Sequence, residues 1–182
     1  MRIEETDLPG VLRVLVDVHG DDRGFFMETW NRRAFADFGI SAVFVQDNFS
    51  RSVKHTLRGL HYQIEQPQGK LVRVVDGEAF DVVVDMRRSS PMFGRWFGET
   101  LSAHNNAALW IPPGYAHGFL ALSDTVAFEY KCTDFYAPEH ERVVRWDDPD
   151  IGIAWPLPDG IGPMLSSRDA GAALLRDAQT YP

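Results

Sequence analysis

Residues 58–63, Arg-Gly-Leu-His-Tyr-Gln, and residues 69–74, Gly-Lys-Leu-Val-Arg-Val, are two short segments that read as consecutive β-strands. Side chains alternate between the two faces of a strand. Gly59, His61 and Gln63 should therefore share one face of the first strand. Because glycine has no side chain, we expect open space beside His61.

The second strand brings a cation to the same region. Lys70, Val72 and Val74 should share one of its faces. An imidazole and an ammonium that face one cavity suit proton abstraction next to a carbonyl, with the cation stabilising the oxyanion. A hydrogen-bonded core histidine and a solvated lysine explain the same residues equally well, so both interpretations of His61 and Lys70 stay open here.

Short alternating segments recur along the chain and predict the fold. They cover residues 11–16, 71–75, 79–86, 100–102 and 126–131. Turn-forming residues such as Asp76-Gly77 and Asn105-Asn106 separate them. Many strands at this spacing indicate an all-β antiparallel sandwich or barrel. No repeat, low-complexity tract or long linker interrupts the pattern, so we expect one domain over residues 1–182.

Two short helices are expected around this β core. Asn31 can cap a helix that stops at Gly39. Ser166 can cap a second helix that runs through Leu175.

Composition is that of an ordinary globular protein, with 45% hydrophobic and 24% charged residues in a chain of 182. Apolar runs such as Val82-Val83-Val84 are too short to span a membrane. Cys132 is the only cysteine, so no intrachain disulfide can form. Residues 1–7 lack the apolar core of a signal peptide, and we expect a cytoplasmic protein.

The net charge of −8 argues against nucleic-acid binding, which relies on basic surfaces. The segment 51–75 differs from the rest of the chain, because Glu65 is its only acid. Its bases are Arg51, Lys54, Arg58, Lys70 and Arg73. This local excess favours a pocket for a small anion such as phosphate, slightly ahead of a solvated basic face.

Residues 112–119, Pro-Pro-Gly-Tyr-Ala-His-Gly-Phe, form a proline-rich turn that feeds a strand. The pattern resembles the second motif of the cupin superfamily, whose histidine often ligates a metal. The first cupin motif has a paired histidine and a downstream glutamate, whereas His61 here is followed by Tyr62 and Gln63. Zinc and iron sites need three or four ligands. We therefore expect no metal site, and we expect His117 to hold a ligand or a hydrogen bond.

Residues 126–131 alternate clearly, which places Val126, Phe128 and Tyr130 on one buried face. A buried tyrosine hydroxyl needs a partner. Tyr130 could donate a proton if it opens into a cavity, and otherwise it is an aromatic core residue with a satisfied hydroxyl.

Several of these segments, together with others, strongly resemble the dTDP-4-dehydrorhamnose 3,5-epimerase family over roughly residues 1 to 170. The matching blocks, in order, are residues 23–26, 46–48, 57–63, 69–73, 112–119, 130–134 and 145–149. The resemblance implies a cupin-type jelly roll without a cofactor. It also implies a homodimer in which the first β-ribbon crosses to the partner subunit.

The family converts dTDP-4-dehydro-6-deoxy-D-glucose to dTDP-4-dehydro-L-rhamnose. The resemblance implies that His61 is the base, that Tyr130 returns a proton from the opposite face, and that Lys70 stabilises the enolate oxygen. Both inverted carbons, C3 and C5, flank the C4 ketone, which acidifies their protons, so the chemistry agrees with the residues. Asp169 matches the carboxylate that orients the histidine, as in other His–carboxylate pairs.

The resemblance also implies ligand contacts. Arg23 would supply charge to phosphate, Phe25 would offer a surface to thymine, and Arg58 suits bidentate binding of a diphosphate. The remaining matches to ligand-contact positions are Glu28, Gln46, Asn48, His117, Phe119, Glu141 and Arg168.

Asp169 has a second interpretation. Residues 166–169, Ser-Ser-Arg-Asp, also read as a capping box, and a helix dipole favours an acid at that place. We expect the two roles to compete, because one carboxylate cannot fully serve both a backbone amide and His61.

Two departures from the family pattern are present. Arg168 stands where lysine is frequent, which changes the geometry of the charge, and Val143-Val144 stands where a glycine is common.

Three other functions compete with the 3,5-epimerase. Relatives in antibiotic deoxysugar pathways invert only C3 or only C5. A nucleotide-sugar binding module would keep Arg23 and Arg58 without needing His61 and Tyr130 together. A metal-dependent cupin oxygenase would require bound iron.

Overall fold

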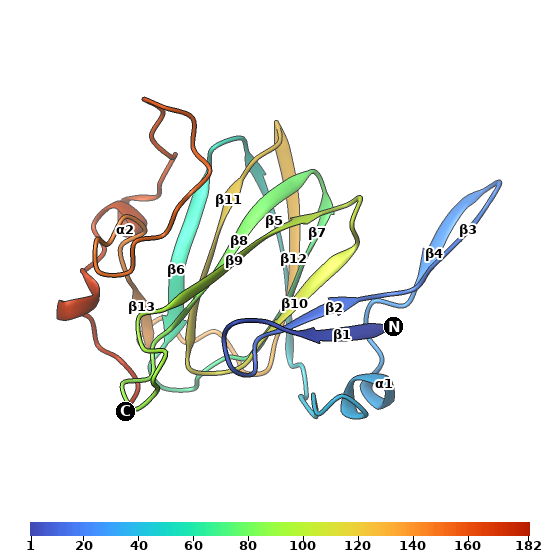
Figure 1. Cartoon of the computed structure of the whole chain (residues 1–182), viewed down its shortest axis with the longest axis horizontal. Helices are drawn as coiled ribbons and strands as arrows, with labels where there is room; N and C mark the ends of the chain where they lie inside the picture. Colours follow the sequence, from blue (N-terminus) through green and yellow to red (C-terminus); the bar gives the residue numbers. More distant parts are fainter.

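The computed structural model describes residues 1–182 as two facing antiparallel sheets and a projecting two-stranded ribbon (Figure 1). The six-stranded sheet has the order β1 (Arg2–Glu5), β2 (Leu12–Leu15), β10 (Ala107–Ile111), β7 (Lys70–Asp76), β12 (Thr125–Cys132) and β5 (Gln46–Val53). The five-stranded sheet has the order β13 (Glu141–Val143), β6 (Leu57–Gln63), β11 (Tyr115–Ala121), β8 (Glu78–Asp85) and β9 (Trp96–Ser102). The all-β prediction, with its jelly-roll sandwich, is confirmed.

The main core lies between the two sheets. Val72, Val126 and Phe128 project into it from the six-stranded sheet, and Val83 and Phe119 do so from the other sheet. Alternation explains this core, because Val72 and Val74 of β7 and Val126 and Phe128 of β12 face inward. The expected shared faces of these two strands are confirmed.

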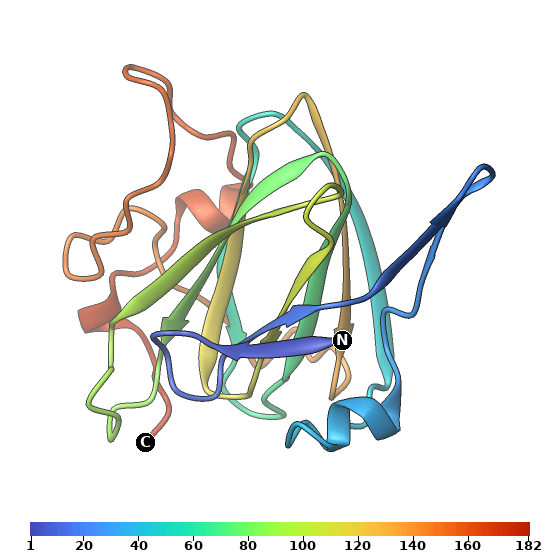
Figure 2. The ribbon, with the colours of Figure 1, turned by 45° about the vertical axis from the view of Figure 1, so that its right-hand side comes forward.

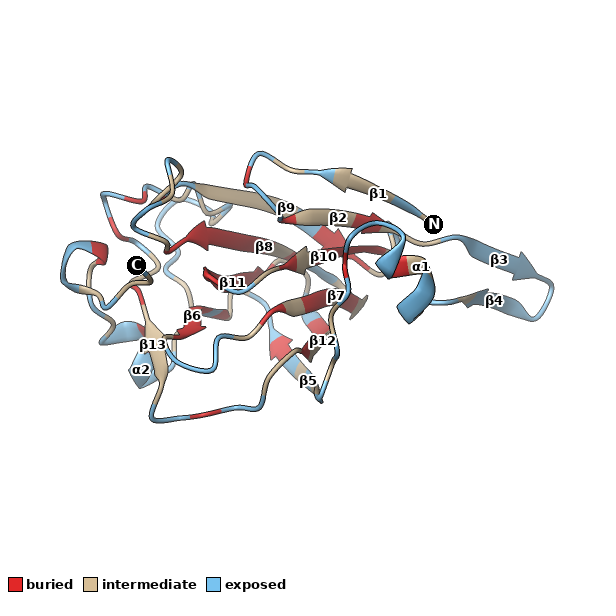
Figure 3. Cartoon of the chain, turned by 90° about the horizontal axis from the view of Figure 1, so that it is seen from below, coloured by how far each residue is buried: buried red, intermediate tan, exposed pale blue.

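Both outer faces of the sandwich are partly covered. Leu60, Tyr62 and Val84, on the outer face of the five-stranded sheet, pack against residues from the C-terminal part of the chain such as Ile151. Because both faces of this sheet are covered, most residues of β8 and β11 are buried (Figure 3). On the other sheet, Phe35 belongs to a smaller cluster over β2 and β10.

The ribbon of β3 (Val18–Asp21) and β4 (Gly24–Met27) projects away from the sandwich (Figure 2). Its aromatic residues Phe25 and Phe26 are 65% and 70% exposed. The ribbon thus presents two large apolar side chains that pack against no core in this chain.

The two helices are shorter than the sequence predicts. In α1 (Arg32–Ala36), the Asn31 side chain accepts hydrogen bonds from two backbone N–H groups, as expected. The prediction that the second helix continues through Leu175 is wrong, because α2 spans only Ser167–Ala170. The Ala173 carbonyl accepts a hydrogen bond from Arg145, and the N–H of Leu175 donates to Asp148, so tertiary bonds draw the chain away before a 3-10 turn at Leu175–Asp177. No helix has the length and apolar character of a membrane span.

Candidate active site

A cavity of about 380 Å³ opens between the two sheets. Six strands, together with the loops that carry Gln68 and Tyr136, supply its walls. The lining residues are Gln46, Asn48, Ser50, Arg58, His61, Tyr62, Gln63, Gln68, Lys70, His117, Phe119, Phe128, Tyr130, Tyr136 and Glu141. Most residues singled out from the sequence therefore meet in one place.

A β-bulge in β6 decides which of its side chains reach the cavity. His61 lies opposite His117 on β11, and Arg58 lies opposite Phe119, so three steps along β6 match two along β11. The extra residue shifts the alternation, which places Arg58 and His61 in the same cavity. The expectation that Gly59 shares the face of His61 by simple alternation is wrong for this reason.

Gly59 also leaves no open space. A Cβ atom at this position would lie 2.5 Å from the Cα of Gly118 and 3.0 Å from the carbonyl oxygen of His117. Gly59 has φ +136°, a conformation that side-chain-bearing residues rarely adopt. Glycine is needed here so that β6 and β11 can approach closely beneath the two histidines.

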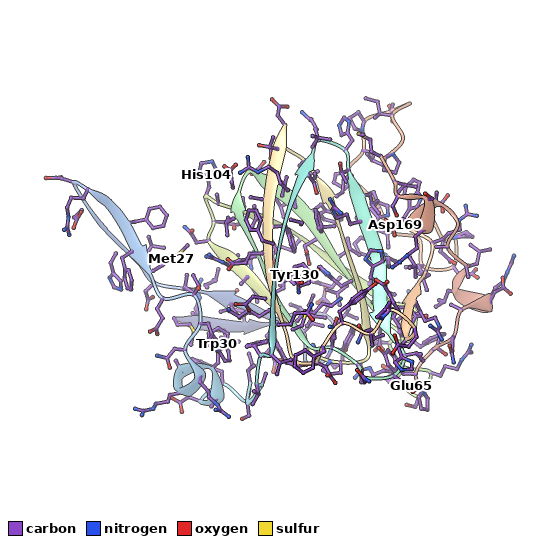
Figure 4. The ribbon with its side chains drawn as sticks, turned by 180° about the vertical axis from the view of Figure 1, so that it is seen from behind. Met27, Trp30, Glu65, His104, Tyr130 and Asp169 are labelled. Atoms are coloured by element: carbon purple, nitrogen blue, oxygen red, sulfur yellow. The ribbon has the colours of Figure 1, made fainter.

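His61 and Asp169 form a short hydrogen bond, with Nε2 and Oδ1 2.6 Å apart. The His61 side chain is 30% exposed, whereas Asp169 is almost fully buried. The carboxylate comes from α2, which lies beside β6 (Figure 4). The structure thus joins two residues that are 108 positions apart in the sequence.

Asp169 does not meet the expected competition, because the side chain of Ser166, and not the Asp169 carboxylate, caps α2. Its Oδ1 contacts His61, and its Oδ2 accepts a hydrogen bond of 2.9 Å from the Ser166 hydroxyl. Ser166 caps α2 itself, because its oxygen accepts the backbone N–H of Asp169. Burial pushes the pKa of Asp169 up, but hydrogen bonds from His61, Ser166 and the Gly59 backbone outweigh it and leave that pKa below its usual value.

Tyr130 faces the cavity from β12, in the opposite sheet from His61 (Figure 4). Its hydroxyl makes no hydrogen bond within the chain, although the ring packs on the edge of the main core. Burial and the neighbouring Cys132 raise the pKa of Tyr130. A neutral phenol with an unused hydroxyl can donate a proton to a bound molecule.

Lys70 lies beside Cys132 in the pairing of β7 with β12 and also lines the cavity. Burial lowers the pKa of Lys70, while Cys132 and Asp81 act in the opposite direction. The ammonium has no carboxylate within ion-pair distance, which leaves it available to a negative charge that develops in the cavity.

His117 takes the hydrogen-bond role that the sequence left open. Its Nε2 lies 2.8 Å from Oδ2 of Asp81, and both residues are buried. No three His, Cys, Asp or Glu side chains gather in a way that could hold a metal ion.

The basic segment 51–75 is not one positive pocket. Lys54 pairs with Asp124 at the surface, and Arg73 pairs with Glu129. Arg51 is exposed on the sheet-edge strand β5. Only Arg58 and Lys70 line the cavity, because Lys54 lies in the turn after β5 and the side chains of the neighbouring strands alternate between inner and outer faces.

Polar side chains form the rest of the cavity wall. The Arg58 Nε donates to the Ser52 hydroxyl, which holds the guanidinium in place. Gln46 donates from Nε2 to Oδ1 of Asn48, so the two amides on β5 are fixed relative to each other. Phe119 stacks on Phe128 with ring centres 4.2 Å apart and forms an apolar part of the wall.

Glu141 lines the cavity and links two other elements. Its Oε2 accepts a hydrogen bond of 2.8 Å from the Tyr136 hydroxyl. The same oxygen forms an ion pair with the Arg168 guanidinium. Arg168 itself does not line the cavity, so it reaches a ligand only through Glu141 in this arrangement. Arg168, which stands where lysine is frequent in the family, makes this ion pair with Glu141. Nothing in the structure explains Val143-Val144.

Arg23, Phe25 and Glu28 are not brought to the cavity of their own chain. Arg23 and Phe25 lie on the projecting ribbon, where the Arg23 guanidinium pairs with Asp21. Glu28 follows β4 and lies in a separate depression near the N-terminus. These three positions are not among the residues that line the cavity.

Sequence reasoning missed two residues of the site. Asp81 stands in the middle of the apolar strand β8, and an acid in such a strand was a usable signal. Tyr136 lies in the loop between β12 and β13 and gave no periodic signal. Its side chain lines the cavity, and its hydroxyl donates a hydrogen bond to Glu141.

Comparison with known proteins gives a consistent result. The family model described as dTDP-4-dehydrorhamnose 3,5-epimerase matches residues 5–177. The dTDP-4-dehydrorhamnose 3,5-epimerase of Pseudomonas aeruginosa is 53% identical over the full length of both chains.

Solved structures agree with this match. The dTDP-6-deoxy-D-glucose-3,5-epimerase of Legionella pneumophila, in complex with dTDP-4-keto-L-rhamnose, is 47% identical with a TM-score of 0.94 and covers 98% of this chain and 94% of its own. A 3'-monoepimerase of Streptomyces bikiniensis, in complex with dTDP-quinovose, is 38% identical with a TM-score of 0.88 and covers 94% and 86%. With its cavity, its two facing histidines and a match over nearly its whole length, this chain belongs to the dTDP-4-dehydrorhamnose 3,5-epimerase family.

Proposed function

We propose that this chain converts dTDP-4-dehydro-6-deoxy-D-glucose to dTDP-4-dehydro-L-rhamnose by inverting C3 and C5. Membership of the family makes it an isomerase that acts on a dTDP-linked keto-deoxysugar. The observation that supports the reaction best is the placement of His61 and Tyr130. They line one cavity from two opposite sheets, so a sugar ring between them would meet a base on one face and an acid on the other.

The reaction begins with proton removal next to the C4 ketone. His61 takes the proton from C3 or C5, and the electron pair of the C–H bond becomes an enolate whose charge rests on the C4 oxygen. Lys70 stabilises that oxygen through its ammonium group. Tyr130 then gives a proton to the same carbon from the opposite face, which inverts it and leaves a tyrosinate and an imidazolium. Proton exchange with solvent restores Tyr130 and His61 before the second carbon reacts.

Asp169 acts through His61 in this proposal. The carboxylate accepts the hydrogen bond from Nε2, which fixes the ring and leaves Nδ1 as the atom that takes the proton. When His61 becomes an imidazolium, the buried negative charge of Asp169 stabilises it. The lowered pKa of Asp169 keeps that carboxylate ionised at neutral pH.

The nucleotide end of the substrate would lie along the polar wall. Arg58 suits the diphosphate, with its guanidinium already oriented by Ser52. Gln46, Asn48 and Glu141 supply further hydrogen-bonding groups. We place the enzyme in the cytoplasm.

We further propose a homodimer in which the β3–β4 ribbon of each chain reaches the partner's cavity. The ribbon carries Arg23 and Phe25 away from their own cavity, and its exposed aromatic residues would be buried against a second copy. Sedimentation equilibrium should give a dimer. An equimolar mixture of inactive His61→Asn and Arg23→Ala chains should regain activity after subunit exchange, because one site in each mixed dimer would have both residues intact. A monomer, or no recovery in a verified mixed dimer, would contradict this arrangement.

Proton NMR in D₂O tests the reaction directly. The purified chain, without added metal, should remove both the C3 and the C5 proton signals of dTDP-4-dehydro-6-deoxy-D-glucose. A reductase trap should then collect the L-rhamno product. No exchange at either carbon in folded protein that still binds dTDP would refute the reaction and leave a binding module.

A mono-epimerase is the second candidate, because the 3'-monoepimerase of Streptomyces bikiniensis shares this fold. Exchange and inversion at one carbon alone would establish it. The choice depends on how the ring sits between His61 and Tyr130, where a misplacement near 1 Å can change rates by roughly a hundredfold.

A further inference from the structure

Asp81 is a fully buried carboxylate that contacts His117, a residue of the cavity wall. It lies on β8, and its Oδ2 lies 2.8 Å from Nε2 of His117. Its other oxygen, Oδ1, is buried and has no hydrogen-bond partner. A buried carboxylate that lacks a partner on one oxygen is costly, so its retention calls for a reason other than stability.

A second carboxylate on the same strand shows what a structural acid looks like here. Asp85 is equally buried, but both of its oxygens accept hydrogen bonds, from Arg87 and from the Ser90 hydroxyl. Its pKa is lowered, because these hydrogen bonds outweigh burial. Burial instead raises the pKa of Asp81, since His117 and Lys70 compensate its charge only in part.

The two groups that offset the charge of Asp81 both line the cavity. His117 and Lys70 come from different sheets, and neither makes an ion pair with any other acid. Asp81 thus lies behind the substrate cavity as a negative charge shared between an imidazole and an ammonium. Its charge favours the protonated form of Lys70, which is otherwise weakened by burial.

We propose that Asp81 is a positioning residue for the epimerisation, acting through His117 and Lys70. This inference rests on the proposed function. The carboxylate accepts the Nε2–H of His117, which fixes the tautomer and leaves Nδ1 as an acceptor for a sugar hydroxyl. The same charge holds Lys70 as an ammonium opposite the enolate oxygen. Asp81 touches no substrate, so its effect should fall on turnover more than on nucleotide affinity.

Asp81→Asn tests the role, and Asp85→Asn is the matched control from the same strand. We expect Asp81→Asn to lower kcat at least tenfold while KM and the affinity for dTDP change less than threefold. Asp85→Asn should reduce Tm at least as much, because it breaks more hydrogen bonds, and should keep kcat within threefold of the unmodified chain. Equal kcat values for the two variants would overturn the proposal.

Nitrogen-15 NMR of the unmodified chain gives a readout that needs no variant. The Nε2 of His117 should carry the proton that lies between it and Asp81, and Asp81→Asn should shift the proton population towards Nδ1–H. An unprotonated Nε2 in the unmodified chain would overturn the proposal, because Asp81 would then be the donor. These results are separable from the proposed function, which fails only if the unmodified chain exchanges neither the C3 nor the C5 proton.

Discussion

Two histidine–carboxylate pairs lie side by side in this molecule and have different surroundings. His61 and His117 face each other across neighbouring strands, and each bonds to one aspartate at hydrogen-bond distance. The His61 side chain is 30% exposed to the cavity, whereas that of His117 is 9% exposed. A histidine–aspartate pair therefore occurs twice, once with its histidine partly exposed and once with its histidine buried.

The carboxylates differ more than the histidines. Asp169 shares its charge with His61, Ser166 and a backbone N–H, and its pKa is lowered. Asp81 has one oxygen without a partner, and its pKa is raised. A base that cycles through a charged form needs a firmly ionised partner, and Asp169 provides one. A residue that only holds a substrate does not need this, so we propose that His61 removes the proton and that His117 positions the substrate.

Replacing His61, the more exposed of the two histidines, should have the largest effect on turnover. We expect His61→Asn to lower kcat by about a thousandfold or more, because the general base is lost. The affinity for dTDP, measured by calorimetry, should stay nearly unchanged. A severe loss of dTDP binding would mean that His61 holds the nucleotide and is not the base.

Neutralising the carboxylate behind the open histidine should have the next largest effect. Asp169→Asn should reduce kcat by roughly a hundredfold, since the amide can hold the wrong tautomer and cannot stabilise an imidazolium. Steady-state kinetics should show the loss in kcat with little change in KM. Activity within twofold of the unmodified chain would show that Asp169 only stabilises α2 and does not act through His61.

Removing the Ser166 hydroxyl, which donates a hydrogen bond to Asp169, should have a smaller effect. Ser166→Ala removes a helix cap worth about 1 kcal/mol, which should lower Tm by about 2–4 °C. It should also reduce kcat, by about tenfold if the lost hydrogen bond is worth ~1.4 kcal/mol to the transition state. Asn31→Ala, which removes the cap of α1, is the matched control. The two variants should lose similar stability, and equal kcat values in both would contradict a role for Ser166 in the site.

The smallest expected effect is on the pH dependence of stability, where the two carboxylates should have opposite signs. The pKa of Asp169 is lowered in the folded state, so its contribution is present above about pH 4 and is lost as pH falls through the folded value. The pKa of Asp81 is raised, so its contribution is present below about pH 4 and is lost as pH rises through the folded value. Urea unfolding between pH 3 and 8 should show a flatter acid-side loss in Asp169→Asn and a steeper one in Asp81→Asn. The same sign of change in both variants would contradict this difference.

Local patterns were sufficient to predict much of the fold. Alternation placed Phe128 and Tyr130 on the inner face of β12, and Lys70 on the inner face of β7, because these strands pair regularly where those side chains lie. Alternation failed in β6, where the bulge and the close approach of Gly59 to Gly118 depend on the neighbouring strand. The sequence of one strand alone does not predict such a contact.

The candidate site shows the same limit. The pairing of His61 with Asp169 was expected only from a family resemblance, because no periodicity links residues 108 positions apart. The end of α2 could not be predicted, since the bonds at Ala173 and Leu175 that stop it are made with distant residues. The proposed role of Asp81 could not be predicted either, because it depends on a contact with His117 on the neighbouring strand. The acid before the three valines of β8 was the one signal in the sequence.

The most direct test of the account is solvent exchange in D₂O, followed by proton NMR, for His61→Asn and His117→Asn side by side. We predict that His61→Asn exchanges neither the C3 nor the C5 proton of the keto-sugar, while His117→Asn exchanges the protons slowly. Exchange by His61→Asn at the rate of the unmodified chain, or its complete loss in folded His117→Asn alone, would contradict the assignment of His61 as the base.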